Sequence, residues 1–410
     1  MFVNLQTLRN NMIYSEKFNE YIGFEEEYYS DFVDYHNFEN IGWSLGNACP
    51  YKCKHCYSSM IRNSSRNLEK SDIDRIISQI SKLPVKTVNL GGNEPWFTNG
   101  LKGESLLPYI LEKLHDHEYK IGITTSGITL INIKKYKPEM LKFINDIDIS
   151  LDHSVAKLHN NNRGSDTYKL AMEALKIAQE ASIEHSIIMC AMKWNFKIDN
   201  LKGMLELCKK YDANLRFNIL KPLEKNHMNY YLPAEQFYTG YQYLLSKCDT
   251  IDISEPRLSA LVKNEKKVCQ CGTSSLRIHS ITEDGIVYVS PCIYMHDFKV
   301  GNLLEDDIFD IINSRPFVEM RLRNHLSSLI PGCVKCERHP YCLGGCAAQA
   351  YLVNFWKTGV RTLNVKEVEC WRDLNFNLKM DGYKSIQNEG KHLVHQNYLC
   401  TWIGKVREDI

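Results

Sequence analysis

Residues 41–56 read IGWSLGNACPYKCKHC, an apolar strand-like run followed at once by three cysteines. Cys49, Cys53 and Cys56 form a CxxxCxxC pattern on the loop that follows the run Ile41–Asn47. Ligands of open α/β sheets and barrels bind beyond the carboxyl ends of the strands. The loop therefore lies where a functional site is expected.

Three thiolates on one short loop are one ligand short of a four-iron cluster, because each iron takes one thiolate. One iron would stay open to a reactant, much as catalytic zinc sites keep an open position. Zinc on the same thiolates would need a fourth ligand, and His55 lies awkwardly between two of them. The spacing favours an iron–sulfur site, with zinc as the alternative.

From residue 41 onward, short β-rich runs alternate with longer segments of helical period. The sequence predicts strands at Ile41–Asn47, Val85–Gly92, Ile121–Ser126, Asp146–Asp152, His185–Met192 and Asn214–Leu220. It predicts helices near 71–83, 104–117, 132–144, 166–182, 199–211 and 234–247. This alternation indicates an α/β fold with a parallel sheet and right-handed crossovers. A doubly wound sheet also fits, but sequential units of equal length favour a partial (βα)6 barrel.

The composition excludes several classes of protein. Among 410 residues, 50 Lys and Arg oppose 49 Asp and Glu, so no overall basic surface indicates nucleic-acid binding. No run approaches the roughly 18 apolar residues that a membrane helix requires. The N-terminal residues show no signal peptide. We therefore expect a cytoplasmic protein that binds neither membrane nor nucleic acid.

The chain has 15 cysteines, and the odd count without an export signal argues against a disulfide framework. Eight of them follow residue 268, namely Cys269, Cys271, Cys292, Cys333, Cys336, Cys342, Cys346 and Cys370. Eight thiolates suit two four-iron clusters. The alternative is one zinc on Cys333, Cys336, Cys342 and Cys346, whose two pairs are only five residues apart. The remaining thiols, Cys190, Cys208, Cys248 and Cys400, fit no group and are expected to be small buried hydrophobes.

These patterns divide the chain into five parts. We expect an N-terminal extension at 1–40, the barrel at 41–232 and a connecting helical segment at 233–265. A small cysteine-rich domain follows at 266–374, and its core is too small to stand without metal. Residues 375–410 show no clear period and are expected to form a tail.

The CxxxCxxC loop after the first strand of such a sheet resembles the radical SAM superfamily, and the match covers roughly residues 41–220. The resemblance implies a [4Fe–4S] cluster on Cys49, Cys53 and Cys56, whose open iron binds S-adenosylmethionine. In that family, one electron from the cluster cleaves the sulfonium, and the resulting 5′-deoxyadenosyl radical takes a hydrogen atom from the substrate.

Later strand ends carry further motifs of that family. Gly91-Gly92-Asn93-Glu94-Pro95 resembles its GGEP motif with an inserted Asn, and Ser150-Leu151-Asp152 resembles its SLDG stretch. Residues 159–164 resemble its HN..RG segment. The resemblance implies that His55 lies at the adenine of S-adenosylmethionine and that Arg163 pairs with its carboxylate. It implies that Gly91, Gly92 and Glu94 lie at the amino group. It implies that Ser126, Ser150 and Asp152 lie near the sulfonium, ribose or carboxylate.

The second cysteine group resembles the SPASM domain of radical SAM enzymes that modify peptides and proteins. The resemblance implies that Cys333, Cys336, Cys342 and Cys370 hold one auxiliary [4Fe–4S] cluster. It implies that Cys346 joins the upstream cysteines on another. Cys269 and Cys271 are only two residues apart, so either both ligate, or one is free and an iron stays open to a substrate thiolate.

The resemblance predicts a maturase that oxidises a ribosomally made peptide and forms a thioether or carbon–carbon crosslink. Its expected partners are the peptide, a separate leader-binding protein and a reductant such as flavodoxin or ferredoxin. A second hypothesis is oxidation of a small molecule, such as an amino sugar, or of one residue of a sulfatase-like protein. A third is an iron–sulfur electron carrier without enzymatic activity, which would need neither an open iron nor the strand-end motifs.

Overall fold

The computed structural model describes residues 36–59, 65–263, 271–325, 330–374, 382–386, 394–395 and 400–408. Ten strands form one sheet, in the order β7-β10-β6-β5-β4-β3-β2-β1-β8-β9. Its central strands are β1 (Asn40–Ser44), β2 (Thr87–Gly91), β3 (Lys120–Thr125), β4 (Asp146–Ser150), β5 (Glu184–Ala191) and β6 (Asn214–Ile219). Neighbours among these six pair in parallel. The predicted α/β fold with six parallel strands is confirmed.

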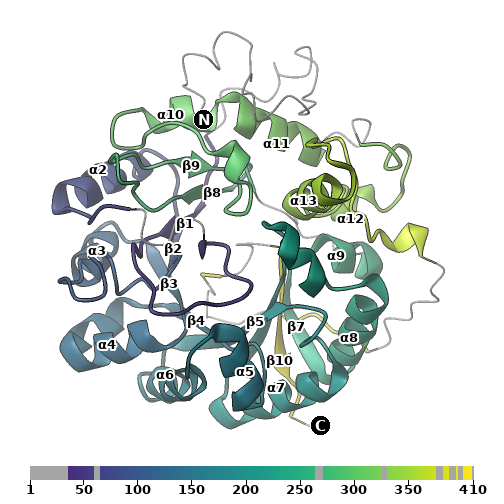
Figure 1. Ribbon diagram of the computed structural model, residues 1–410, viewed down its shortest axis with the longest axis horizontal. Coiled ribbons are helices and arrows are strands. Elements are labelled where there is room, and N and C mark those ends of the chain that lie inside the picture. The colour runs from purple at the N-terminus through teal and green to yellow at the C-terminus, as the bar shows by residue number, and fades with distance from the viewer. Residues whose placement is uncertain are drawn as a thin grey trace.

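Helices form an outer ring around the curved sheet (Figure 1). The ring includes α2 (Lys70–Ile80), α3 (Leu107–Asp116), α4 (Ile128–Tyr136), α6 (Tyr168–Glu180), α7 (Ile198–Tyr211) and α8 (Ala234–Lys247). In α2 the isoleucines at 73, 76, 77 and 80 are all buried. Their spacing of three and four residues places them on one face of the helix. Each such burial contributes roughly 1.5–3 kcal/mol relative to exposure.

Two helical segments differ from the prediction. The single helix expected near 132–144 is α4 followed by a separate 3-10 helix, η5 (Pro138–Phe143). Pro138 causes the break because it has no backbone N–H to continue the helix. Helix α5 (Ala156–Arg163) was not predicted, since only His159 and Asn162 of its eight residues are buried and it lacks an apolar stripe.

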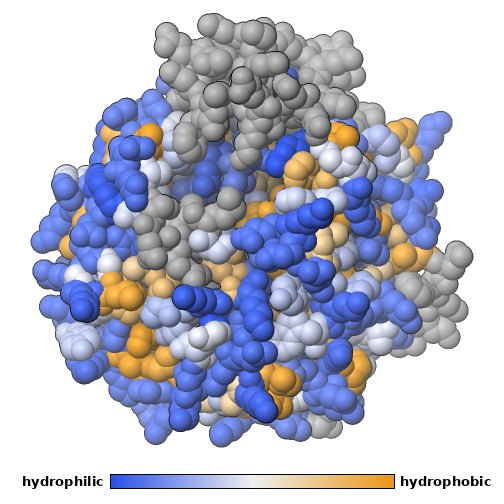
Figure 2. Space-filling view, in the orientation of Figure 1, coloured by the Kyte–Doolittle hydropathy of each residue, from blue (hydrophilic) through white to orange (hydrophobic). Residues whose placement is uncertain are grey.

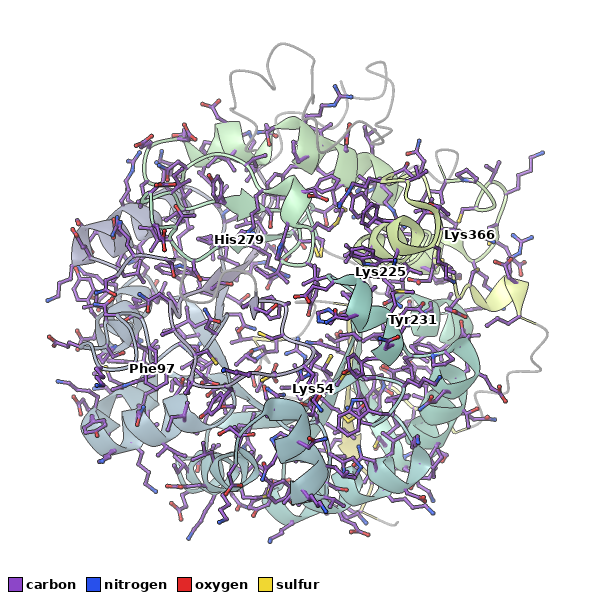
Figure 3. The ribbon with its side chains drawn as sticks, in the orientation of Figure 1. Lys54, Phe97, Lys225, Tyr231, His279 and Lys366 are labelled. Carbon is purple, nitrogen blue, oxygen red and sulfur yellow. The ribbon has the colours of Figure 1, made fainter. Side chains whose placement is uncertain are left out.

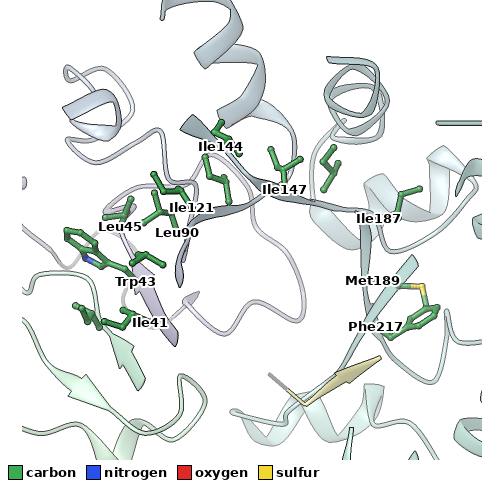
Figure 4. Close-up of a cluster of buried hydrophobic side chains, with 14 of the residues drawn as sticks. Ile41, Trp43, Leu45, Leu90, Ile121, Ile144, Ile147, Ile187, Met189 and Phe217 are labelled. Carbon is green, nitrogen blue, oxygen red and sulfur yellow. The ribbon is translucent and has the colours of Figure 1, made fainter. Parts of the chain in front are cut away.

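The two faces of the sheet differ in polarity. Register partners such as Trp43, Leu90 and Ile123 share the face that packs against the helices, where they are buried. Figure 4 shows part of this apolar cluster, from Ile41 through Ile147 to Phe217. The opposite face carries polar residues, and Asp148 on it is paired with the guanidinium of Arg216. The barrel therefore has an apolar outer layer and a polar interior.

Four further strands extend the sheet beyond the six. β8 (Ser275–Ile278) pairs in parallel with β1, and β9 (Val289–Ser290) pairs antiparallel with β8. At the other edge, β10 (Thr401–Val406) pairs antiparallel with both β6 and β7 (Cys248–Ile253). The segment expected to be a tail thus supplies a strand inside the sheet.

The chain from residue 254 onward forms a further set of helices. They are α9 (Pro256–Val262), α10 (Ile308–Ile312), α11 (Arg315–His325), α12 (His339–Cys342) and α13 (Ala347–Thr358), with the 3-10 helices η7 (His296–Phe298) and η9 (Trp371–Asp373). In the described ranges, no helix has the length and apolarity to span a membrane. On the face shown in Figure 2, described hydrophobic residues are scattered in small groups among hydrophilic ones.

Candidate iron–sulfur and S-adenosylmethionine site

A cavity of about 160 Å³ lies beyond the carboxyl ends of the central strands. The predicted site residues that line it are Cys49, Cys53, Cys56, His55, Gly92, Glu94, Ser126, Ser150 and Arg163. Gly91 lines a neighbouring cavity in the barrel interior, and Asp152 lies beneath the surface. The structure therefore brings together motifs that are more than 100 residues apart in the sequence.

The cysteine loop rests on helix α5. The backbone N–H groups of Lys52 and Lys54 donate to the carbonyls of Arg163 and Asn162, at 3.2 and 3.0 Å. Gly164 ends the helix with φ +66°, and a Cβ there would lie 3.2 Å from the Lys52 carbonyl oxygen. Glycine suits both the left-handed backbone and this close approach. The segment that resembles HN..RG thus supports the loop that carries the thiols.

Asp152 and Arg163 form a buried ion pair beside this loop. The Nε of Arg163 donates to Oδ2 of Asp152 at 2.7 Å, and Asn162 Nδ2 donates to the same oxygen at 2.9 Å. Burial alone would raise the pKa of Asp152, but the nearby guanidinium holds it well below its usual range. The terminal nitrogens of Arg163 lie at the cavity wall, where Nη1 is 3.9 Å from Cys53 Sγ.

His55 enters the cavity as a neutral ring. Asn162 Nδ2 lies 3.0 Å from His55 Nδ1, and burial lowers the pKa of His55 to about 4. An uncharged imidazole can lie against an aromatic base without the desolvation cost of a cation. Its position beside the thiols fits the predicted place next to an adenine.

Glu94 ties two strand-end loops together. Its buried carboxylate accepts hydrogen bonds from Thr125 Oγ1 at 2.6 Å, Thr129 Oγ1 at 2.9 Å and the Ser126 N–H at 2.8 Å. Burial raises the pKa of Glu94, and these donors oppose the rise. With three donors at the carboxylate, Glu94 fixes the loop after β2 to the loop after β3.

The inserted Asn93 is accommodated by the turn between β2 and Glu94. It adopts φ +49°, and its Nδ2 donates to the Gly46 carbonyl at 2.8 Å. The preceding Gly92 has φ +72°, and a Cβ on it would lie 2.5 Å from Cβ of Ser44. Only glycine fits at that position, so the turn is pinned against β1.

The four cysteines 333, 336, 342 and 370 line one pocket together with Lys366, Glu367 and Arg372. Tight turns build it: the Cys336 N–H donates to the Cys333 carbonyl at 2.9 Å, and Gly344 and Gly345 have φ of +75° and +90°. The structure thus brings together the four thiols that the resemblance assigns to one auxiliary cluster.

A second pocket is lined by Cys271, Cys292, Cys346 and Cys400. Cys269 lies outside the described residues. Nothing in the sequence groups Cys400 with the others, because it belongs to no motif and lies 54 residues after Cys346. Asn218, Ile219, Lys221 and Tyr294 line both this pocket and the main cavity. The two sites therefore adjoin.

The main cavity includes further residues that the motifs did not indicate. Lys221, after β6, is buried, and its Nζ donates to the Ile219 carbonyl at 3.1 Å and to Gln349 Oε1 at 3.0 Å. Cys190 ends β5 at the wall, and burial raises the pKa of its thiol. Figure 3 shows Lys54 of the cysteine loop and Lys225 and Tyr231 of the segment after β6 around the middle of the barrel.

The spacing of the sulfurs tests the zinc alternative. A tetrahedral zinc with Zn–S bonds of about 2.3 Å would place its sulfurs roughly 4 Å apart. Across the described part of the chain, the only group of three potential ligands within 4.8 Å of one another is Asp146, Asp148 and His395. Cys346 also lines a different pocket from Cys333, Cys336 and Cys342. The four cysteines of the zinc alternative therefore do not share one pocket, whereas Cys333, Cys336, Cys342 and Cys370 do.

Comparisons with known proteins agree with this geometry. Residues 43–205 match the family model of the radical SAM superfamily, and residues 269–337 match that of SPASM, an iron–sulfur cluster-binding domain. The chain is 26% identical to the mycofactocin maturase MftC of Mycolicibacterium smegmatis over 320 residues, which cover 76% of this chain and 78% of the relative. It is 22% identical to a probable GTP 3′,8-cyclase of Pyrococcus abyssi, over 53% of this chain and 69% of the relative.

Two solved structures share the fold. Streptococcus suis SuiB bound to the precursor peptide SuiA is similar with a TM-score of 0.59 and 17% identity, over 82% of this chain and 76% of SuiB. The enzyme anSMEcpe with AdoMet and the Cp18Cys peptide has a TM-score of 0.56 and 17% identity, over 79% of this chain and 93% of that one.

Proposed function

Because the chain carries a radical SAM domain followed by a SPASM iron–sulfur domain, we propose that it is an oxidising maturase of a ribosomally made peptide. The observation that carries this proposal is the shared wall between the main cavity and a pocket of buried thiols. A substrate in the main cavity would lie beside an electron acceptor. The similarity to a mycofactocin maturase and to a structure holding a precursor peptide supports a peptide substrate.

The radical SAM domain implies S-adenosylmethionine and a [4Fe–4S] cluster as cofactors, and the SPASM domain implies auxiliary clusters. Cys49, Cys53 and Cys56 would hold the first cluster, and the two later cysteine groups would hold the others. When bound, these groups supply a 5′-deoxyadenosyl radical that takes a hydrogen atom from the substrate, and an acceptor for the surplus electron.

The residues of the chain position and shield these groups. Arg163, held by Asp152 through Nε, would pair with the methionine carboxylate through its terminal nitrogens. His55 would lie against the adenine, and Gly92 and Glu94 would shape the wall beside the amino group. Because the cavity walls come from several strand ends, the rigid sheet fixes their relative positions.

The bond formed would be a thioether or a carbon–carbon crosslink. Either product forms with the net loss of two hydrogen atoms, which requires the electron sink that the auxiliary thiols indicate. The alternative, oxidation of a small molecule or of one residue in a sulfatase-like protein, is less favoured. The mycofactocin maturase shares about three quarters of the chain, whereas the GTP cyclase shares about half.

The proposed electron donor and the proposed cellular compartment follow from the same chemistry. A flavodoxin or ferredoxin would supply the electron, and the reducing cytoplasm would keep the thiols free to bind iron. Leader binding is proposed to use a separate protein or the surface of the SPASM-like domain. We keep the division into barrel (41–232) and SPASM-like domain (266–374), while β10 joins the region after 374 to the sheet.

The decisive experiment is anaerobic reconstitution followed by reaction. The full chain should bind about twelve irons if three cubes form. With S-adenosylmethionine, a reductant and candidate precursor peptides, it should release 5′-deoxyadenosine and yield a peptide lighter by two hydrogens. The variant with alanine at Cys49, Cys53 and Cys56 should give neither product. Turnover of a free sugar with no change in any peptide would refute the proposal.

A further inference from the structure

We propose that Cys400 is the fourth protein ligand of the auxiliary cluster that Cys271, Cys292 and Cys346 hold. This inference rests on the proposed function only in taking the pocket to hold an iron–sulfur cluster. The family pattern accounts for three of these thiols and gives Cys400 no role. The four thiols line a single pocket.

The four thiols share one sheltered environment. Cys271, Cys292, Cys346 and Cys400 are only 4–6% exposed, and they belong to one hydrophobic cluster with Met295, Met320 and Leu363. Burial in apolar surroundings protects a cluster from water. The ammonium of Lys221 lines the same pocket, where it would offset part of the negative charge that four thiolates bring.

The sheet holds Cys400 in place. The next residue, Thr401, is the first of β10 and pairs with Asn218 of β6. Asn218 itself lines the pocket. The Thr401 carbonyl accepts hydrogen bonds from the N–H groups of Ser254 and Glu255, both at 2.8 Å. Cys400 is therefore attached to a central strand that is paired on both sides, not to a loose terminus. A ligand fixed in this way loses little conformational entropy on binding.

The remaining described thiols have other surroundings. Cys190 lies in the main cavity. Cys208, on α7, has its Sγ 3.8 Å from the Asn214 carbonyl oxygen, and Cys248 begins β7 opposite Val406 at the far end of β10. Neither is among the residues that line the three pockets described above. Cys248 is the matched control, since it is a fully buried thiol beside the same strand.

Four cysteines give each iron of a cube one thiolate, so this cluster would have no open iron. It would then accept an electron without binding a substrate thiolate. It would also leave Cys269 without a required role as ligand, although the sequence offers Cys269 and Cys271 equally. The ligand set therefore decides whether this cluster only accepts an electron or also binds a substrate thiolate.

The test uses the full chain with alanine at Cys49, Cys53 and Cys56, so that only the auxiliary clusters remain. After anaerobic reconstitution this parent should bind about eight irons. Adding Cys400→Ala should lower the iron content by one to four and, on mild oxidation, give the electron paramagnetic resonance signal of a three-iron cluster. Adding Cys269→Ala or Cys248→Ala should leave the iron content and spectra unchanged. Parent-like spectra for Cys400→Ala, or loss with Cys269→Ala, would overturn the inference.

A second variant covers the case in which Cys400→Ala does not fold. Cys400→Ser has nearly the same volume and offers a harder oxygen ligand, so it should fold and shift the reduction potential of one auxiliary cluster. An unchanged potential would contradict ligation by Cys400. The experiment distinguishes failure of the proposed function from failure of this inference. A parent that binds no iron refutes the proposal of iron–sulfur clusters. A Cys400→Ala variant that still binds eight irons with parent-like spectra refutes only the role of Cys400.

Discussion

Asp152 is buried directly beneath Arg163 and holds its guanidinium by a 2.7 Å contact from Nε, without reaching the cavity itself. The resemblance implies that Asp152 contacts S-adenosylmethionine, and the structure places it beside Arg163, the residue expected to bind the carboxylate. Such a carboxylate orients the cation and keeps it in one rotamer.

We predict that Asp152→Asn weakens the binding of S-adenosylmethionine about tenfold, as loss of a charge partner worth about 1.4 kcal/mol would do. The three cysteines are untouched, so the iron content of the first cluster should stay the same. Equilibrium binding to the reconstituted protein measures the change. Asp199→Asn, at an exposed position on α7, is the control. Unaltered affinity in Asp152→Asn would show that Arg163 needs no partner.

Glu94→Gln should lower the free energy of unfolding by about 1–3 kcal/mol, the cost of an unsatisfied buried polar group. The amide nitrogen would face either the Ser126 N–H, which can only donate, or the hydroxyls of Thr125 and Thr129, which now donate to the carboxylate. Chemical denaturation at neutral pH measures the loss. Glu112→Gln, on the exposed side of α3, should be neutral. Equal stability of the two variants would rule out the bridging role of Glu94.

His159 predicts a dependence of stability on pH. Its Nδ1 accepts from the Asp152 N–H at 3.0 Å, its Nε2 lies 2.9 Å from Thr167 Oγ1, and burial lowers its pKa to about 4. Because the unfolded chain binds the proton near pH 6.5, the stabilising contribution is complete above that pH. It is lost as the pH falls from there toward 4, at up to about 1.4 kcal/mol per pH unit.

Denaturation series at pH 7, 6 and 5 would measure this slope. His159→Gln cannot bind the proton, so its stability should fall less steeply over the same range. His153→Gln is the comparison, since His153 is only partly buried. If His159→Gln and the parent have parallel pH profiles, His159 does not titrate in this way.

The sequence predicts the six central strands well because their pattern is local. Each is a short apolar run bounded by turn residues, and each predicted helix between them has apolar residues at the helical period of 3.6 residues. Strand β10 has only a weak local signal, and its pairing partners on β6 lie more than 180 residues earlier in the chain. Strand propensity depends on such neighbours more than on the residues themselves. Helix α5 was missed for a related reason, because contacts to the cysteine loop hold it rather than an apolar face.

The residues of the candidate site also differ in how well the sequence predicts them. The CxxxCxxC loop and the strand-end motifs are contiguous in sequence, and so they can be recognised there. Cys400 carries no motif, and only the sheet brings it to Cys346. The signal that could have found it is weak: a cysteine directly before a run, TWIGKV, that reads as a strand.

Trp402 should couple the stability of the sheet to the auxiliary cluster. It is fully buried in β10, its Nε1 donates to Thr250 Oγ1 at 3.1 Å, and its ring stacks on Phe217 with centroids 5.8 Å apart. Trp402→Ala should lower the free energy of unfolding by about 3–5 kcal/mol, as large buried aromatics do. Because Cys400 lies two residues before it, the loosened strand should also lose auxiliary iron.

Thermal unfolding and iron content, measured on the same reconstituted sample, test this coupling. Lys405→Ala, on the exposed part of β10, should change neither. Trp402→Phe keeps a ring for the stack on Phe217 but removes the hydrogen bond, so it should cost less stability and retain the iron. A Trp402→Ala protein that is destabilised yet binds as much iron as the parent would show that the position of Cys400 does not depend on β10.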